Sequence, residues 1–236
     1  MNIFFTPNIS GKSYTLNENE SKHCIRVLRN NVGDKLTLTD GRGGWYLARI
    51  SDANPKKCKV EVEEHISAHE KRDYYLHVAI APTKNTDRFE WFLEKATEIG
   101  IDEITPLLCE NSERKQLKPD RLEKVIVAAM KQSLKAYLPK LNNLTNFEAL
   151  IKSQESGSKY IAHCSQGDKV HLFNLLKPAG RVLILIGPEG DFSSQEIELA
   201  LANDYTPISL GSSRLRTETA GVSAVQIVNV VNEIEQ

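Results

Sequence analysis

The sequence lacks the features of a disulfide-stabilised, metal-binding or membrane-inserted protein. It has no C-x-x-C pair, which argues against a disulfide framework and a tetrahedral zinc site, so we expect reduced thiols at Cys24, Cys58, Cys109 and Cys164. No apolar run approaches the roughly 18 to 20 residues of a membrane helix, and residues 1–7 carry no basic segment typical of a secretion signal. We therefore expect a cytoplasmic protein with no membrane anchor and no metal.

A large charge imbalance is also missing. The formal net charge of −1 over 236 residues excludes a globally basic nucleic-acid binder. Residues 1–72 nevertheless hold 12 Lys and Arg against 9 Asp and Glu, whereas the rest of the chain holds 18 against 22. This weak asymmetry favours an N-terminal part that faces RNA.

Residues 1–70 are predicted to form a small β-barrel domain. Short runs of alternating apolar residues cover Leu36–Thr39, Trp45–Ile50 and Lys57–Val62, and the turn Asp40–Gly44 is rich in glycine. Alternation of this kind is typical of strands with one buried face.

A short helix is predicted ahead of these strands, over Ser21–Arg29, where apolar residues recur at helical intervals. We expect its polar positions, with Arg42 and Trp45 beside them, to contact RNA; a solvated helix face is the alternative. The polar positions are His23, Arg26 and Arg29.

Residues 74–236 are predicted to form an α/β domain with a parallel sheet. The run Val182–Ile186 is continuously apolar, as expected for a strand covered on both faces, and strands alternate with helices along the segment. Thr86 is a candidate helix cap, and Ser193 with Glu196 forms a capping box. Further strands are expected over Tyr75–Ala81, Ile104–Cys109, Lys159–Cys164 and Ile208–Leu210, and helices over 86–99, from Pro119, over 194–202 and over Thr217–Ile234.

The turn after the central strand is a candidate cofactor site. Ligands of parallel sheets bind beyond the carboxyl ends of the strands, and glycine allows a ligand to approach the backbone. Neither the G-x-x-x-x-G-K-[ST] nor the G-x-G-x-x-G motif occurs, so a phosphate-bearing cofactor has little support. A turn with a purely structural role is the alternative interpretation. The candidate cofactor-binding residues of this turn are Ile186, Gly187, Pro188, Glu189 and Gly190.

A second loop strengthens that prediction, because it also leaves a strand and then enters a helix. It brings two cations, an acid and two hydroxyls to one turn, although a solvated loop with a threonine cap would look similar. Its candidate residues are Leu210, Gly211, Leu215, Arg216, Thr217, Glu218, Thr219 and Ala220.

These two loops resemble those of the 16S ribosomal RNA uracil-N3 methyltransferases of the SPOUT superfamily. The resemblance covers the whole chain, since His23–Arg29 resembles the family's H-x-x-x-V-L-R segment and further elements match at Lys84, Lys95–Gly100 and Gln132–Ser133. The chain departs from the family pattern at Asp191, where glycine is common, at Lys135 and at Ser213-Arg214.

The resemblance implies a PUA-like barrel followed by a SPOUT domain with a trefoil knot, which the pattern alone would replace by a flavodoxin-like or Rossmann-like sheet. It implies a homodimer that binds S-adenosylmethionine and methylates uracil 1498 in 16S ribosomal RNA of the small ribosomal subunit. Lys84 and Lys95 are then further RNA contacts. The final helix fits a subunit contact, because it has almost no polar face.

Within such an enzyme, Arg216 is expected to stabilise negative charge on the uracil carbonyl oxygens. Glu218 either accepts the N3 proton or orients Arg216, and the sequence slightly favours orientation. Two other functions stay open at this point. One is a non-catalytic, dimeric RNA-binding or ribosome-assembly protein, and the other is a different small-molecule transferase.

Overall fold

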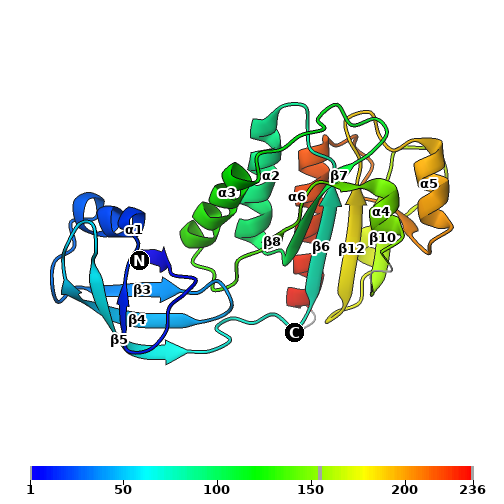
Figure 1. Ribbon diagram of the computed structural model, residues 1–236. Helices are drawn as coiled ribbons and strands as arrows, with labels where there is room; N and C mark the ends of the chain where they lie inside the picture. The colour runs from blue at the N-terminus through cyan, green and yellow to red at the C-terminus, as the bar shows by residue number, and fades with distance from the viewer. Residues whose placement is uncertain (1, 154–155, 235–236) are drawn as a thin grey trace. The chain divides into compact units, whose positions relative to one another are not determined.

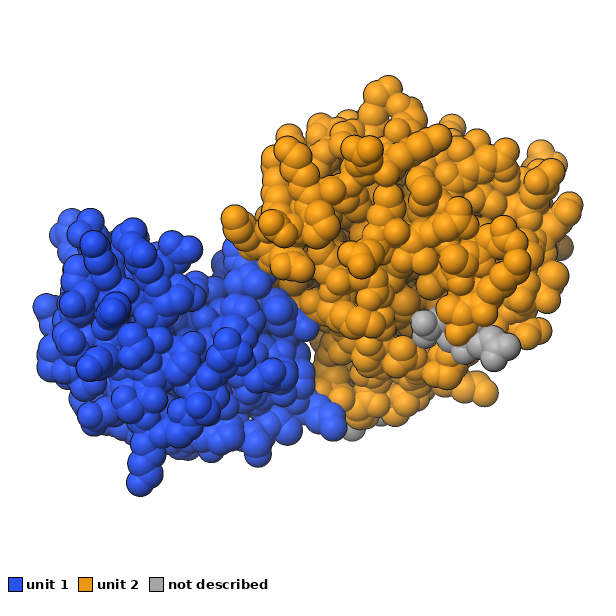
Figure 2. All heavy atoms as spheres, viewed as in Figure 1, with its two compact units in different colours: residues 1–71, 127–138 blue, residues 72–126, 139–236 orange. Residues whose placement is uncertain are grey.

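The computed structural model describes residues 2–153 and 156–234, and the chain divides into two compact units (Figure 2). Unit 1 consists of residues 1–71 and 127–138, and unit 2 of residues 72–126 and 139–236. The sequence predicted a first domain over 1–70, but it gave no sign that residues 127–138 associate with that domain.

Unit 1 is built on a five-stranded sheet with strand order β1-β3-β4-β5-β2. The β1 and β3 strands are parallel, the other pairs are antiparallel, and register shifts between β4 and β5 bend the sheet. The core contains the fully buried Phe4, Leu38 and Val60. The strands are β1 (Ile3–Phe5), β2 (Ser13–Thr15), β3 (Lys35–Thr39), β4 (Trp45–Asp52) and β5 (Lys59–Ile66).

The predicted helix over Ser21–Arg29 is two different helical segments. The α1 helix (Glu18–Lys22) is capped by Asn17 and runs into the π-helix η1 (His23–Val27). The Leu28 N–H donates to the His23 carbonyl oxygen at 3.0 Å, five residues back, and this wide turn places Cys24 in the core. Helical spacing alone does not distinguish a π turn from an α turn.

Residues 127–138 join unit 1 through long-range hydrogen bonds. The Thr39 hydroxyl donates to the Ala136 carbonyl oxygen at 3.2 Å, and the Leu138 N–H donates to the Gly41 carbonyl oxygen at 2.9 Å. Lys131 forms an ion pair with Glu20 at 2.6 Å. These partners lie about a hundred residues apart in the sequence, so no local pattern indicates them.

Unit 2 contains a parallel sheet with strand order β11-β13-β10-β12-β6-β7-β8, and β9 pairs with β7 (Figure 1). The predicted parallel α/β architecture is therefore confirmed. The strands are β6 (Tyr75–Ile80), β7 (Glu103–Leu108), β8 (Lys140–Leu141), β9 (Thr145–Asn146), β10 (Ser158–Ala162), β11 (Val170–His171), β12 (Arg181–Ile186) and β13 (Thr206–Ser209).

Helices cover both faces of this sheet. The α2 and α6 helices pack together and α6 contacts β6 and β12, while side chains of α4 and α5 share a core with Ala79, Leu107 and Leu185 on the other face. The helices are α2 (Thr86–Ile99), α3 (Pro119–Gln132), α4 (Phe147–Ile151), the 3-10 helix η2 (Leu172–Asn174), α5 (Ser194–Leu201) and α6 (Thr217–Ile234).

The predicted caps are right in one case and wrong in the other. Ser193 and Glu196 form the expected capping box of α5. The cap of α2 is Asn85, whose side-chain oxygen accepts the Asp87 N–H at 3.0 Å, and Thr86 is the first helical residue. Asn and Thr both cap helices well, so the sequence did not separate adjacent candidates.

Candidate active site at the ends of three strands

The strand order brings the two predicted loops to the same edge of the sheet. The β10 strand pairs with β12 on one side and β13 on the other, so that Ala162 at its end lies opposite both Ile186 and Ile208. All three strands are parallel, and the loops that leave their carboxyl ends therefore adjoin. These are residues 187–190 after β12, 210–216 after β13 and, between them, 163–164 after β10.

A buried side chain joins the first of these loops to α6. The Thr217 hydroxyl, in a residue that is 6% exposed, donates a hydrogen bond to the Gly187 carbonyl oxygen at 3.1 Å. Thr217 is the first residue of α6 and Gly187 is the first residue after β12. This hydrogen bond thus joins the start of α6 to the turn after β12.

Hydrogen bonds with neighbouring residues also fix the Gly187–Gly190 turn. The Glu189 carboxylate accepts the Lys84 N–H at 2.9 Å, and the Asp191 N–H donates to the Pro188 carbonyl oxygen at 2.9 Å. A Cβ atom on Gly187 would lie 3.1 Å from the Phe192 ring. The turn therefore has a fixed backbone that presents peptide groups beyond β12.

Asp191, directly after the Gly187–Gly190 turn, has a backbone conformation that favours glycine. Its φ angle is 64°, in the left-handed region that glycine adopts at no steric cost and that Asp tolerates. Its carboxylate accepts the Cys164 N–H at 2.7 Å and so ties the β10 loop to the β12 loop. Asp191 thus combines a left-handed backbone conformation with a contact between the two loops.

Glu218 lies in the first turn of α6, and its carboxylate is buried with 8% side-chain exposure. Its Oε1 atom lies 3.8 Å from Arg88 Nε on α2, and its Oε2 atom is buried without a hydrogen-bond partner. Arg216 is exposed, and among the described residues no ion pair joins it to Glu218. The structure therefore does not pair Glu218 with the arginine that the sequence suggested.

Two residues near this site were not identified from the sequence. One is Arg88, the partner of Glu218. The other is His163, directly after β10, whose Nδ1 atom is buried without a partner. Burial and the nearby Lys169 ammonium lower the pKa of His163 below its usual value of 6.5, against the opposing effect of Asp191, and so favour the neutral ring. Only the strand order reveals that the loop after β10 lies between the predicted loops.

The predicted RNA contacts occupy different environments. His23, Arg26 and Arg29 are exposed in unit 1, as a binding role requires. Lys84 forms an ion pair with Glu113 at 2.7 Å, and Lys95 forms ion pairs with Glu94 and Glu98, at 2.9 Å and 2.8 Å.

Trp45 was expected to help contact RNA, and this expectation is wrong. Its side chain is 7% exposed and packs against His69, with 4.5 Å between the ring centroids. Arg42 beside it is exposed and donates to the Pro7 carbonyl oxygen at 2.8 Å.

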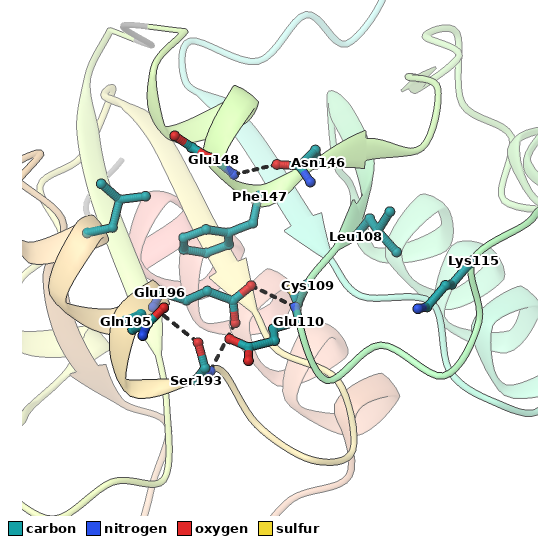
Figure 3. A pocket seen from close by; sticks show the side chains of 11 residues that line it. Leu108, Cys109, Glu110, Lys115, Asn146, Phe147, Glu148, Ser193, Gln195 and Glu196 are labelled. Atoms are coloured by element: carbon teal, nitrogen blue, oxygen red, sulfur yellow. Dashed lines mark hydrogen bonds between the residues drawn. The ribbon is translucent and has the colours of Figure 1, made fainter.

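A pocket of about 390 Å³ lies in unit 2 between the end of β7 and the starts of α4 and α5 (Figure 3). None of the predicted cofactor residues lines it. Glu196 in this pocket accepts the Glu110 and Ser193 N–H groups, both at 2.9 Å, and so has a structural role in capping α5. The candidate site is therefore the loop cluster, not this pocket.

The loop cluster has buried polar groups that are available to a ligand. Its two unpartnered buried atoms, Glu218 Oε2 and His163 Nδ1, are the polar groups that a bound ligand would satisfy. In the described part of the chain, no group of three His, Cys, Asp or Glu side chains could hold a metal, and no helix is long and apolar enough to span a membrane.

Comparisons with known proteins define the class. A family model described as an RNA methyltransferase domain matches residues 70–229, and one described as an RNA methyltransferase PUA domain matches residues 16–63. The class is thus that of RNA methyltransferases with a PUA domain, and the predicted PUA-like and SPOUT-type α/β fold class is confirmed.

Individual proteins that are similar to this chain belong to the same class. The chain is 30% identical to the ribosomal RNA small subunit methyltransferase E of Mesomycoplasma hyopneumoniae, over 75% of this chain and 78% of the relative. A crystal structure of a probable rRNA-methyltransferase from Porphyromonas gingivalis is 40% identical, with a TM-score of 0.93 over 100% of both chains. A methyltransferase structure from Legionella pneumophila, in complex with the cofactor S-adenosylmethionine, is 26% identical, with a TM-score of 0.86 over 98% of this chain and 97% of the other. The chain belongs to the ribosomal RNA small subunit methyltransferase E family.

Proposed function

We propose that this protein transfers the methyl group of S-adenosylmethionine to the N3 atom of uracil 1498 in 16S ribosomal RNA of the small ribosomal subunit. Family membership supports an RNA methyltransferase, and the relatives support a small-subunit substrate and this cofactor. The observation that carries the proposal is the joining of the β12 loop to α6 by Thr217, next to the buried, half-partnered carboxylate of Glu218.

The cofactor would be held by main-chain groups of the two loops, with Leu215 and the first turn of α6 beside them. Bound S-adenosylmethionine supplies an electrophilic methyl group, so the chain's own residues need only align the uracil and remove its N3 proton. The proposed cofactor-binding residues are Ile186, Gly187, Pro188, Glu189, Gly190, Leu210, Gly211, Leu215, Arg216, Thr217, Thr219 and Ala220.

Arg216 and Glu218 are the proposed catalytic residues. The exposed guanidinium of Arg216 stabilises negative charge on the uracil carbonyl oxygens as the N3 proton leaves. Glu218 accepts that proton, because its Oε2 atom has no partner and its other oxygen faces Arg88 rather than Arg216. This assignment replaces the orienting role that the sequence slightly favoured.

The remaining parts of the proposal follow the family. A PUA-like domain over residues 1–70 binds ribosomal RNA through His23, Arg26 and Arg29, and the SPOUT domain over residues 74–236 adds Lys84 and Lys95. The SPOUT domain contains the trefoil knot, and the protein acts in the cytoplasm as a homodimer. The α6 helix supports the dimer, because its half-buried outer face carries Val222, Ile227 and Val230.

Calorimetry and methyl transfer test this function together. We expect the wild-type chain to bind S-adenosylmethionine and to methylate small subunits that lack the modification. Arg216→Ala and Glu218→Gln should each slow transfer by about 100-fold, as loss of a charge-stabilising or proton-accepting group does. Normal turnover in both variants would contradict the assignment. No binding of the cofactor would favour a non-catalytic RNA-binding protein.

A further inference from the structure

Arg88 occupies a position that local electrostatics does not favour. It is the third residue of α2, and a cation in the first turn of a helix opposes the helix dipole. Its guanidinium is 43% exposed and its Nε atom points to one acid, Glu218 on α6, at 3.8 Å. A tertiary contact therefore accounts for the placement of this arginine.

A second arginine near the start of α2, Arg121, pairs with acids of α2 itself rather than with Glu218. Arg121 lies on α3, and its guanidinium contacts two carboxylates near the start of α2, Glu90 at 2.5 Å and Asp87 at 3.5 Å. Arg121 thus forms ion pairs with the acids close to the start of α2, whereas Arg88 forms an ion pair with Glu218.

A close contact between the helices fixes the distance between Arg88 and Glu218. Phe92 lies one turn after Arg88 on α2, and Gly221 lies one turn after Glu218 on α6. A Cβ atom on Gly221 would lie 2.7 Å from Phe92 Cε2 and 2.8 Å from Ile80 Cδ1. The two helices approach this closely only because Gly221 has no side chain.

The ion pair between Arg88 and Glu218 leaves one oxygen of the Glu218 carboxylate without a partner. Glu218 Oε1 faces Arg88, whereas Oε2 is buried without a partner. At 3.8 Å the guanidinium neutralises the carboxylate but forms no direct hydrogen bond, which requires about 2.7 to 3.2 Å. A buried carboxylate that is charge-compensated on one side keeps its lone pairs on the other side for a proton.

We propose that Arg88 is a positioning residue that fixes the orientation of the Glu218 carboxylate and directs its Oε2 atom to the N3–H group of the target uracil. The inference rests on the proposed function. The N3 proton passes to Oε2, the N3 lone pair forms the bond to the methyl carbon, and the electron pair of the broken C–S bond stays on sulfur. Arg88 touches none of the reacting atoms and acts through Glu218.

Single-turnover methyl transfer tests this role, with saturating cofactor and small subunits that lack the modification. Arg88→Ala should lower the rate by about 10- to 100-fold, the usual effect of a misplaced catalytic group, and should leave the KM for subunits within about 3-fold. Arg88→Lys keeps the charge without the planar fork and should fall in between. The matched control is Arg121→Ala, which removes an ion pair at the same helix end and should change the rate by less than about 2-fold.

Two further measurements distinguish a positioning role of Arg88 from a general structural role. In a Glu218→Gln background, Arg88→Ala should have no further effect, because residues that act through one another are not additive. Subunits with 5-fluorouridine at the target should recover most of the rate that Arg88→Ala removes, since fluorine makes the N3–H group more acidic and reduces the need for a base.

The inference is overturned if Arg88→Ala transfers methyl groups normally, if its effect adds fully to that of Glu218→Gln, or if the loss lies in KM alone. Melting temperatures and cofactor affinities close to wild type in Arg88→Lys would show that the protein is folded. These outcomes differ from failure of the proposed function, in which the wild-type chain itself would form no 3-methyluridine.

Discussion

Thr217 and Gly187, thirty residues apart in the sequence, are joined by a buried hydrogen bond of 3.1 Å from the threonine hydroxyl to the glycine carbonyl oxygen. The bond fixes the start of α6 against the turn that follows β12. A hydrogen bond that restricts the proposed cofactor site in this way reduces the entropic cost of binding.

The first prediction concerns this hydrogen bond. Thr217→Ala leaves the buried Gly187 carbonyl without a donor, which costs about 1 kcal/mol or more, and should weaken S-adenosylmethionine binding by about 5- to 10-fold. Titration calorimetry measures the affinity. Thr217→Ser keeps the hydroxyl and is the matched control. Equal affinities for the Ala and Ser variants would show that the bond does not organise the site.

A second prediction concerns RNA binding by unit 1. Arg26 and Arg29 are exposed, and their replacement by Ala should weaken binding to 16S ribosomal RNA and reduce its dependence on salt, by about one unit of logarithmic slope for each phosphate that is no longer neutralised. Filter binding at several salt concentrations measures this. Arg49→Ala is the control, because Arg49 is paired with Glu63 at 2.7 Å on the sheet. An unchanged salt slope in the double variant would indicate a solvated helix face.

A third prediction concerns the outer face of α6. Ile227 is half-buried in the single chain, and Ile227→Glu would place a charge in the proposed subunit contact. The variant should be monomeric by light scattering at concentrations where the wild type is dimeric. Gln195→Glu adds the same charge at an exposed position of α5, away from the proposed contact, and should stay dimeric. A monomeric wild type, or a dimeric Ile227→Glu variant, would reject this interface.

A fourth prediction concerns pH and a buried carboxylate at the start of β7. Burial alone would raise the pKa of Glu103, but hydrogen bonds from Lys140, Asn142 and Tyr75, each at 2.7 Å, lower it to about 2. Because the folded pKa lies below the usual 4.5, Glu103 stabilises the fold above pH 4.5, and the contribution of about 3 kcal/mol disappears as the pH falls from 4.5 to 2.

Urea unfolding at pH 7 and in that acid window measures the contribution of Glu103. Glu103→Gln should lower the free energy of unfolding at pH 7 by about 3 kcal/mol and flatten the acid limb of the stability curve. Glu148→Gln, which removes only an exposed pair with Lys152, should leave the curve almost unchanged. An acid limb as steep in Glu103→Gln as in the wild type would place the titrating group elsewhere.

The fold class could be predicted because its signals are local. The apolar run Val182–Ile186 is the buried β12 strand, and the Ser193 and Glu196 capping box starts α5 as expected. The association of residues 127–138 with unit 1 could not be predicted, because it depends on hydrogen bonds such as that between Thr39 and Ala136. No periodicity indicates a hydrogen bond between such distant residues.

The candidate site was also predictable only where its signals are local in the sequence. The loops at Gly187 and Thr217 were identified from composition, and strand order then joins them. The sequence missed the pairing of Arg88 with Glu218, since 130 positions separate them and the distance depends on how closely α2 and α6 pack. It also missed His163, because the position of its loop depends on β10 lying between β12 and β13.

Mapping of 3-methyluridine in 16S ribosomal RNA tests the central claim most directly. Ribosomal RNA from cells that lack this protein should contain no 3-methyluridine at position 1498. The purified wild-type chain with S-adenosylmethionine should restore it in isolated small subunits, whereas the Glu218→Gln variant should do so about 100-fold more slowly. Full modification at position 1498 in the deleted cells, or methylation by the purified chain at a different atom or nucleotide, would contradict the account.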